Sequence, residues 1–197
     1  MSKIIICIFL GLQLCAAQKT NPVIFAEIYG GFAAGSSSGW TGGFDLNYQY
    51  KKDLLTVRYL RLTGLRSDPI VIGFAAFPSY KRIDEIHEYA ILYGKRYIRD
   101  NKSYSCSVGI AKMNREFLKL QDGLYVEYAG KYIGVPFECN VKWFKPEKKR
   151  IRLYGILPVG KPTAIGASFG FKFFGTISKT SYVGAGISLG YGYHKQY

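Results

Sequence analysis

The sequence has few cysteines, few histidines and few acidic residues. Its 197 residues include 4 cysteines, 2 histidines and 13 acidic side chains, against 27 lysines and arginines. Cys7 and Cys15 precede the expected mature chain, which keeps Cys106 and Cys139. Two cysteines are too few for a disulfide scaffold, and their spacing is not that of a metal site. We therefore expect neither a metal nor a cofactor.

The N-terminal apolar run is too short to span a membrane. MSKIIICIFLGLQLCAAQ has a cationic start at Lys3, an apolar run from Ile4 to Leu12 and small residues before Gln18. A spanning helix needs about 20 residues, whereas this shorter pattern is typical of a secretory signal. We predict a signal peptide at residues 1–17, cleaved after Ala17, and one domain at residues 18–197.

A nucleotide-binding motif is also missing. In GILPVGKPT, Gly155, Gly160 and Lys161 have the spacing of a phosphate-binding loop, but serine or threonine is required where Pro162 stands. Strand-like sequence follows instead of a helix, so no helix N-terminus faces a phosphate. The formal charge of +14 favours anionic partners. For an exported chain without a nucleic-acid-binding motif, we expect phosphate-bearing lipid rather than nucleic acid.

Helical periodicity is nearly absent, and period-two alternation recurs along the chain. Such alternation between turn residues predicts an all-β meander, sandwich or barrel. Eight runs alternate clearly, at about residues 22–34, 40–50, 54–62, 85–98, 103–113, 133–143, 164–174 and 181–197. The stretches 69–78 and 150–157 are undecided. We favour eight strands, with ten as the alternative.

The two faces of these runs differ in an unusual way. In the last stretch, SYVGAGISLGYGYHKQY, large apolar residues alternate with glycine and serine. A soluble sheet would cover its second face with polar bulk, whereas a small membrane barrel turns that face into a narrow lumen. The remaining polar residues of this face should form a paired network that fills the lumen: Glu27, Asp45, Arg58, Glu88, Glu138 and Lys172.

The lengths of the connections predict an orientation. The short links at residues 51–53 and 99–102 fit periplasmic turns, and the long segments at 63–84 and 114–131 fit external loops. Basic residues at 145–152 and around the first long segment either bind lipopolysaccharide phosphates or form a solvated rim. The residues of that second group are Arg61, Arg66, Lys81 and Arg82.

The remaining cysteines and histidines are weak candidates for chemistry. Cys106 and Cys139 lie on the apolar faces of neighbouring runs, where they either pair in a disulfide or face lipid as free thiols. His87 and the adjacent Glu88 point to opposite faces of a strand, so they cannot form a base and its orienting carboxylate. His194 lies in the terminal tail, as expected for a periplasmic rim. We predict no catalytic residue.

The final strand resembles the C-terminal assembly signal of outer-membrane β-barrels from Gram-negative bacteria. The residues that carry this resemblance are Ile187, Leu189, Tyr191, Tyr193 and the terminal Tyr197. The segments NYQYKKDLLTVRY, EYAILYGKRY and IGVPFECNVKWF are similar to a family of small outer-membrane barrel proteins of OmpA/OmpX-type architecture. The resemblance implies an outer-membrane location and recognition by the barrel-assembly machinery, but no activity.

These observations predict an antiparallel up-and-down transmembrane β-barrel, monomeric, non-enzymatic and in contact with outer-membrane lipid and lipopolysaccharide. With its lumen filled by side chains, we expect a structural, adhesive or surface-binding protein. The alternatives are a narrow pore, a lipid A-modifying outer-membrane enzyme and a soluble periplasmic lipocalin-like barrel.

Overall fold

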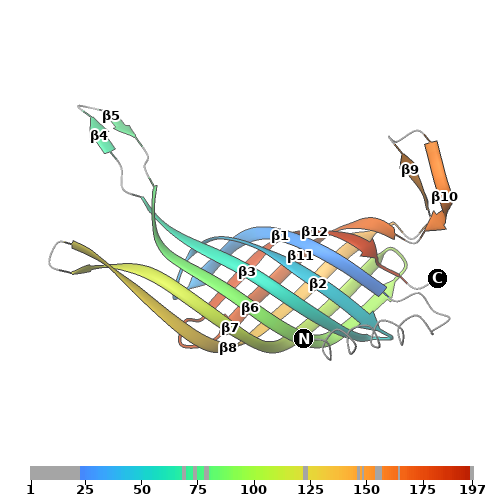
Figure 1. Ribbon diagram of the computed structural model, residues 1–197, viewed down its shortest axis with the longest axis horizontal. Coiled ribbons are helices and arrows are strands. Elements are labelled where there is room, and N and C mark those ends of the chain that lie inside the picture. Colours follow the sequence, from blue (N-terminus) through green and yellow to red (C-terminus); the bar gives the residue numbers. More distant parts are fainter. Residues whose placement is uncertain are drawn as a thin grey trace, which may run out of the picture.

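The computed structural model describes residues 23–67, 70–72, 75–77, 80–121, 124–145, 147, 149–153, 157–163 and 165–195 (Figure 1). The expected signal peptide at residues 1–17 and the terminal Tyr197 lie outside this part of the chain. Among the described residues, no helix is long and apolar enough to cross a membrane.

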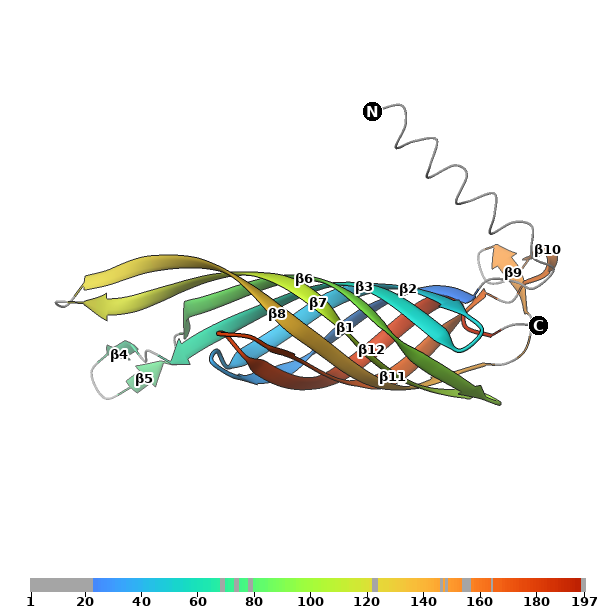
Figure 2. The same ribbon diagram turned by 90° about the horizontal axis from the view of Figure 1, so that it is seen from below.

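Eight antiparallel strands close into a barrel, in the spatial order β1-β12-β11-β8-β7-β6-β3-β2 (Figures 1 and 2). Every pair of neighbours is antiparallel, and β1 closes the barrel on β12. The predicted all-β barrel of eight strands is therefore confirmed. The strands are β1 (Val23–Gly35), β2 (Gly39–Tyr50), β3 (Asp53–Ser67), β6 (Tyr80–Arg99), β7 (Lys102–Gln121), β8 (Leu124–Phe144), β11 (Ile165–Ile177) and β12 (Tyr182–Tyr193).

Both undecided stretches form small hairpins outside the barrel. Strands β4 (Ile70–Ile72) and β5 (Ala75–Phe77) pair with each other, as do β9 (Lys149–Leu153) and β10 (Leu157–Thr163). The two hairpins lie beyond opposite ends of the barrel (Figure 1). The ten-strand alternative is therefore wrong, because neither hairpin contributes a strand to the barrel.

The alternation in the sequence sets which side chains point inward. In β12, Val183, Ile187 and Leu189 are exposed on the outer wall, whereas Ser188 and Gly190 are buried against the lumen. This division follows from strand geometry, because successive side chains point to opposite faces. Glycine and serine leave the room that bulky polar side chains of other strands need inside a barrel this small.

The two ends of the barrel are built differently. Short turns with positive φ at Lys51 (54°) and Asp100 (52°) join β2 to β3 and β6 to β7 at the end where β1 begins and β12 ends. At the other end, β3, β6, β7 and β8 run beyond the remaining strands (Figure 2). The segment 114–131, predicted as a loop, instead continues the β7–β8 hairpin out to the pair Gln121 and Leu124.

Pro136 interrupts pairing without changing the register. Its place inside the alternating run 133–143 suggests a bulge, because proline removes a ladder donor. The pairs on either side, Val108 with Phe137 and Ala111 with Gly134, keep one register along β7 and β8. The irregularity lies instead between β3 and β6, where the register shifts after Gly64.

Candidate functional site

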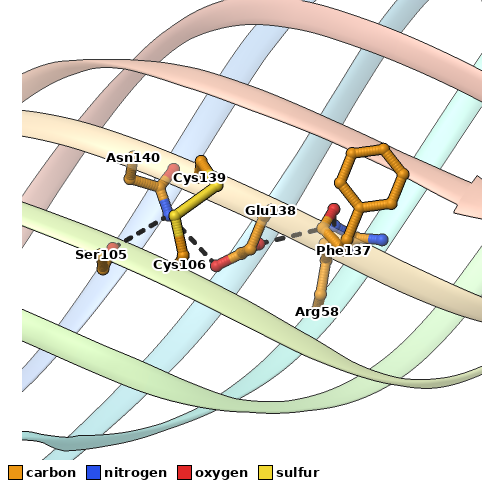
Figure 3. The surroundings of a disulfide bond; sticks show 7 residues. All are labelled: Arg58, Ser105, Cys106, Phe137, Glu138, Cys139 and Asn140. Carbon is orange, nitrogen blue, oxygen red and sulfur yellow. Dashed lines mark hydrogen bonds and ion pairs between the residues drawn. A yellow bond between two sulfur atoms is a disulfide. The ribbon is translucent and has the colours of Figure 1, made fainter.

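The middle of the lumen is organised around Arg58 of β3. Its Nη2 donates to Glu88 Oε1 at 2.6 Å, and its Nη1 lies 3.5 Å from Glu138 Oε2. The same Nη1 donates to the carbonyl of Phe137 at 3.3 Å (Figure 3). All three charged side chains are 0–1% exposed. A buried guanidinium is thus held between two carboxylates from other strands, which compensates its charge.

The second oxygen of Glu88 is also bonded. Thr176 Oγ1 donates to Glu88 Oε2 at 2.5 Å, and the Tyr182 hydroxyl donates to it at 2.7 Å. These donors come from β11 and from the start of β12. Glu88 therefore joins strands on opposite sides of the barrel through one carboxylate.

Two lysines complete the network. Lys172 of β11 pairs with Asp45 and lies 3.0 Å from Glu138 Oε2, while Lys142 of β8 pairs with Glu27. All six residues proposed for the lumen are buried. Five of them are joined by ion pairs, and Glu27, which pairs with Lys142, lies opposite Asp45 in the β1–β2 register. Sequence reasoning missed Lys142 and its neighbour Asn140. Their positions, four and two residues after the lumen-facing Glu138, place them on the same face and could have identified them.

A layer of apolar side chains lies across the lumen near the end from which the long strands extend. It consists of buried residues from β1, β3, β6, β7, β11 and β12: Tyr29, Ala33, Leu60, Leu62, Ile86, Met113, Phe174 and Tyr182. Charged groups and water are both poorly accommodated in such a layer. This layer lies between the charged network and the end of the barrel from which the long strands extend.

A second packed group lies at the end where β1 begins and β12 ends. Arg96 Nη1 donates to Gln49 Oε1 at 2.8 Å and to the carbonyl of His194 at 3.1 Å, and its guanidinium lies over the Phe25 ring at 4.6 Å. The imidazole of His194 stacks on Phe144. Burial and the nearby charge of Arg96 lower the pKa of His194 to about 4, so this ring is neutral at physiological pH. The predicted rim histidine is thus part of this packed group.

The outer wall of the barrel is apolar and carries the cysteine pair. Large apolar side chains are exposed there, among them Ile110 at 71% and Ile133 at 78%. Cys106 of β7 and Cys139 of β8 lie directly opposite each other, with Cα atoms 4.3 Å apart, and form a disulfide on this wall (Figure 3). The structure therefore has the disulfide, rather than two lipid-facing free thiols.

A polar cluster lies on the outer wall of β3 and β6, toward the end where these strands extend beyond the barrel. His87 Nδ1 lies 2.9 Å from the Tyr59 hydroxyl, and His87 Nε2 lies 3.1 Å from Glu85 Oε1. Arg61 and Arg82 also pair with Glu85. Glu85 thus anchors two arginines.

The carboxylate partner of His87 differs from the one considered in the sequence. Glu88 points into the lumen, as expected from its adjacent position, whereas Glu85 lies on the outer face two residues before His87. Period-two alternation could have identified this pair. Because both arginines bind the same carboxylate, the arrangement is an ion-paired cluster and not a base with a free orienting carboxylate.

The other predicted site residues fall into two groups. Ile187, Leu189 and Tyr191 are exposed on the outer wall in β12, and Tyr193 is half-buried at its end. Of the basic residues considered for phosphate binding, Arg61 and Arg82 belong to the polar cluster, and Lys145 is exposed at the end of β8. The side chains of Arg66, Lys81 and residues 148–152 lie outside the described part of the chain.

No protein-family model matches this chain, and no curated protein matches it. Three solved structures have a similar fold, each at 9% sequence identity. The N-terminal β-barrel domain of Pseudomonas aeruginosa OprF has a TM-score of 0.47, covering 86% of this chain and 98% of that one. Neisserial surface protein A has a TM-score of 0.48, covering 85% of this chain and 93% of that one. Ail, the attachment invasion locus protein of Yersinia pestis, has a TM-score of 0.48, covering 85% of this chain and 95% of that one.

Proposed function

We propose that this chain is a small outer-membrane β-barrel protein without catalysis, which binds surfaces or adheres through the sheet that extends beyond its barrel. The protein is a monomer anchored among outer-membrane lipid and lipopolysaccharide. Its last strand, with Ile187, Leu189 and Tyr191 on the outer wall, is the part that the barrel-assembly machinery recognises, together with Tyr193 and Tyr197.

The wall and the lumen support this proposal against its alternatives. A soluble barrel would expose its apolar belt to water, including Trp40 at 66% and Ile133 at 78%. Lipid is the solvent that suits such a wall. A pore would need an open lumen, whereas the lumen described above is filled by paired charges between two packed groups. The lumen therefore acts as a rigid support for what lies beyond the rim.

One observation carries the binding function: β8 has a long unpaired edge. Strand β11 pairs with β8 from Val135 onward, so β8 from Leu124 to Gly134 has β7 on one side and no strand on the other among the described residues. An exposed edge offers a row of free N–H and C=O groups, and proteins that do not use such edges usually protect them. An extended segment of a partner can add to it as a further strand.

The side chains of the extended sheet favour such contacts. Leu118 and Tyr125 are exposed on one face, and Val126 and Tyr128 are exposed on the other. The Tyr128 ring stacks on Phe117 at 5.6 Å, which stiffens the hairpin. A sheet that shows apolar and aromatic residues on both faces and at an open edge has the composition of a protein-binding surface.

The open edge can be blocked at one residue. The 4.3 Å Cα separation of Cys106 and Cys139 is that of a pair without mutual hydrogen bonds, so odd-numbered residues of β8 direct their N–H groups away from β7. Ala129→Pro would remove one edge donor and leave the β7–β8 ladder intact. We expect cells displaying Ala129→Pro to lose most of their retention on protein-coated glass, by about fivefold or more.

Ala129→Val is the matched control, because valine keeps the donor and favours strands. Its retention should equal that of the wild type. Equal retention of the proline variant would refute the edge as the binding element. The membrane location is tested separately by fractionation and by heat-modifiable gel mobility, and recovery of the unheated protein in the soluble periplasmic fraction would refute it.

A further inference from the structure

An apolar groove runs along the outer wall of the barrel. It crosses β2, β3, β6, β7 and β8 and has a volume of about 1160 Å³. Val57, Ile91 and Ile110 line it, and each is at least half exposed. A concave apolar surface of this size on a membrane-facing wall is suited to acyl chains.

Two lysines border this groove. Lys112 lies opposite Tyr89 of β6 and Ile133 of β8, and Lys131 lies two residues from Ile133 on the same strand. Both side chains are exposed on the outer wall. In an antiparallel pair, diagonal neighbours of this kind have Cα atoms about 7–8 Å apart. Two flexible ammonium groups at that spacing can bind one phosphate group together.

Neither lysine forms an ion pair with a described carboxylate, and the exposed Glu116, a diagonal neighbour of Lys131, is not bonded to it. Three other exposed cations are paired: Arg61 and Arg82 with Glu85, and Lys95 with Asp53 at 2.9 Å. Lys102, which is exposed at the other end of β7, has no ion pair among the described residues. Within the part of the chain that the structure describes, Lys112 and Lys131 form no ion pair. An unpaired cation on a lipid-facing wall is costly unless its head reaches the interface or meets an anion.

The groove and the lysines together define a ligand. We propose that Lys112 and Lys131 bind the phosphate of one phosphorylated, acylated glycolipid of the outer leaflet, whose acyl chains lie in the groove. This proposal rests on the outer-membrane location and orientation proposed above. It commits to a lipid rather than to free phosphate, because the cations and the apolar surface form one continuous site.

The test compares lipids and variants by calorimetric titration of the full chain, refolded in nonionic detergent. The probe is bisphosphorylated lipid A. We expect Lys112→Gln/Lys131→Gln to weaken its binding at least about tenfold, because two charge-assisted contacts are lost. Dephosphorylated lipid A should bind the wild type about as weakly. Ile110→Trp, which keeps the wall apolar but fills the groove, should weaken binding of the phosphorylated lipid about threefold or more.

The matched control removes two charges at the other end of the barrel. Lys51→Gln/Lys52→Gln has the same net charge as the lysine variant and should bind lipid A like the wild type. Wild-type affinity in Lys112→Gln/Lys131→Gln would overturn the proposal, and so would displacement of the lipid by inorganic phosphate at equal concentration. Heat-modifiable mobility in zwitterionic vesicles is measured alongside. A wild-type protein that does not insert there would refute the membrane location, whereas failure of the lysine prediction alone would leave it standing.

Discussion

Replacing Arg58 by alanine should destabilise the barrel by about 3–5 kcal/mol, the largest effect expected of a single substitution. The change leaves Glu88 and Glu138 buried without their shared cation, and each of these carboxylates is 0–1% exposed. Lys172 still contacts Glu138, so Glu88 bears most of the loss. The measurement is the free energy of unfolding in urea, with the protein folded in lipid vesicles and the unfolded fraction read from gel mobility.

Two further variants compare the stability contribution of this buried ion pair with that of an exposed one. Arg61→Ala removes an arginine whose side chain is 48% exposed, so its loss should cost at most about 1 kcal/mol. In Arg58→Met/Glu88→Gln, both charges disappear while glutamine can still accept from Thr176 and Tyr182. That variant should regain at least half of the stability lost in Arg58→Ala. If Arg58→Ala costs no more than Arg61→Ala, water compensates the lumen charges and the lumen is not a packed plug.

The strands of the barrel could be predicted because each lies between two different environments. The outer wall needs apolar side chains and the narrow lumen needs small or paired polar ones, so every strand carries a period-two pattern. That pattern is local and does not identify the partner strand. Residues 69–78 and 150–157 therefore look like barrel strands, although they form separate hairpins. A short run with period-two alternation has the same pattern in a barrel strand and in a separate hairpin.

The extended hairpin was missed for the opposite reason. Beyond the barrel, β7 and β8 are exposed on both faces, so the sequence of residues 114–131 has no consistent buried face to mark it as a strand. The stacked pair Phe117 and Tyr128 holds two positions that are adjacent only across the hairpin. Loop length alone suggested an external segment, and it could not distinguish a loop from a continued ladder.

The composition of the lumen could be predicted, but its pairings could not. Alternation places Arg58, Glu88 and Glu138 on inward faces. Which carboxylate meets which cation depends on strand order and on the stagger of the closed barrel. Arg58 and Glu138 are 80 residues apart in the chain. Similarly, alternation excludes Glu88 as a partner of His87, and the contact that forms is with Glu85, two residues away on the same face.

Loss of the disulfide should be the second largest effect. Cys106 and Cys139 are separated by 33 residues, and closing a loop of that length restricts the unfolded chain by about 4 kcal/mol in the chain-entropy model. We expect Cys106→Ala/Cys139→Ala to lower the free energy of unfolding in urea by about 3–4 kcal/mol. The wild type measured in reductant should fall to the same value, because both treatments remove the same link.

The location of the disulfide predicts which part of the protein loses local stability when the disulfide is removed. It joins β7 to β8 on the outer wall, three residues from Pro136, where the ladder between these strands is interrupted. Hydrogen exchange should therefore rise first in this hairpin, and with it in the extended sheet that carries the open edge, while β1 and β2 keep their protection. Reductant should not change the alanine variant, which controls for effects on other groups. A thiol assay on unreduced protein that labels both cysteines would contradict the disulfide, and the stability difference would then measure packing of two small side chains against lipid.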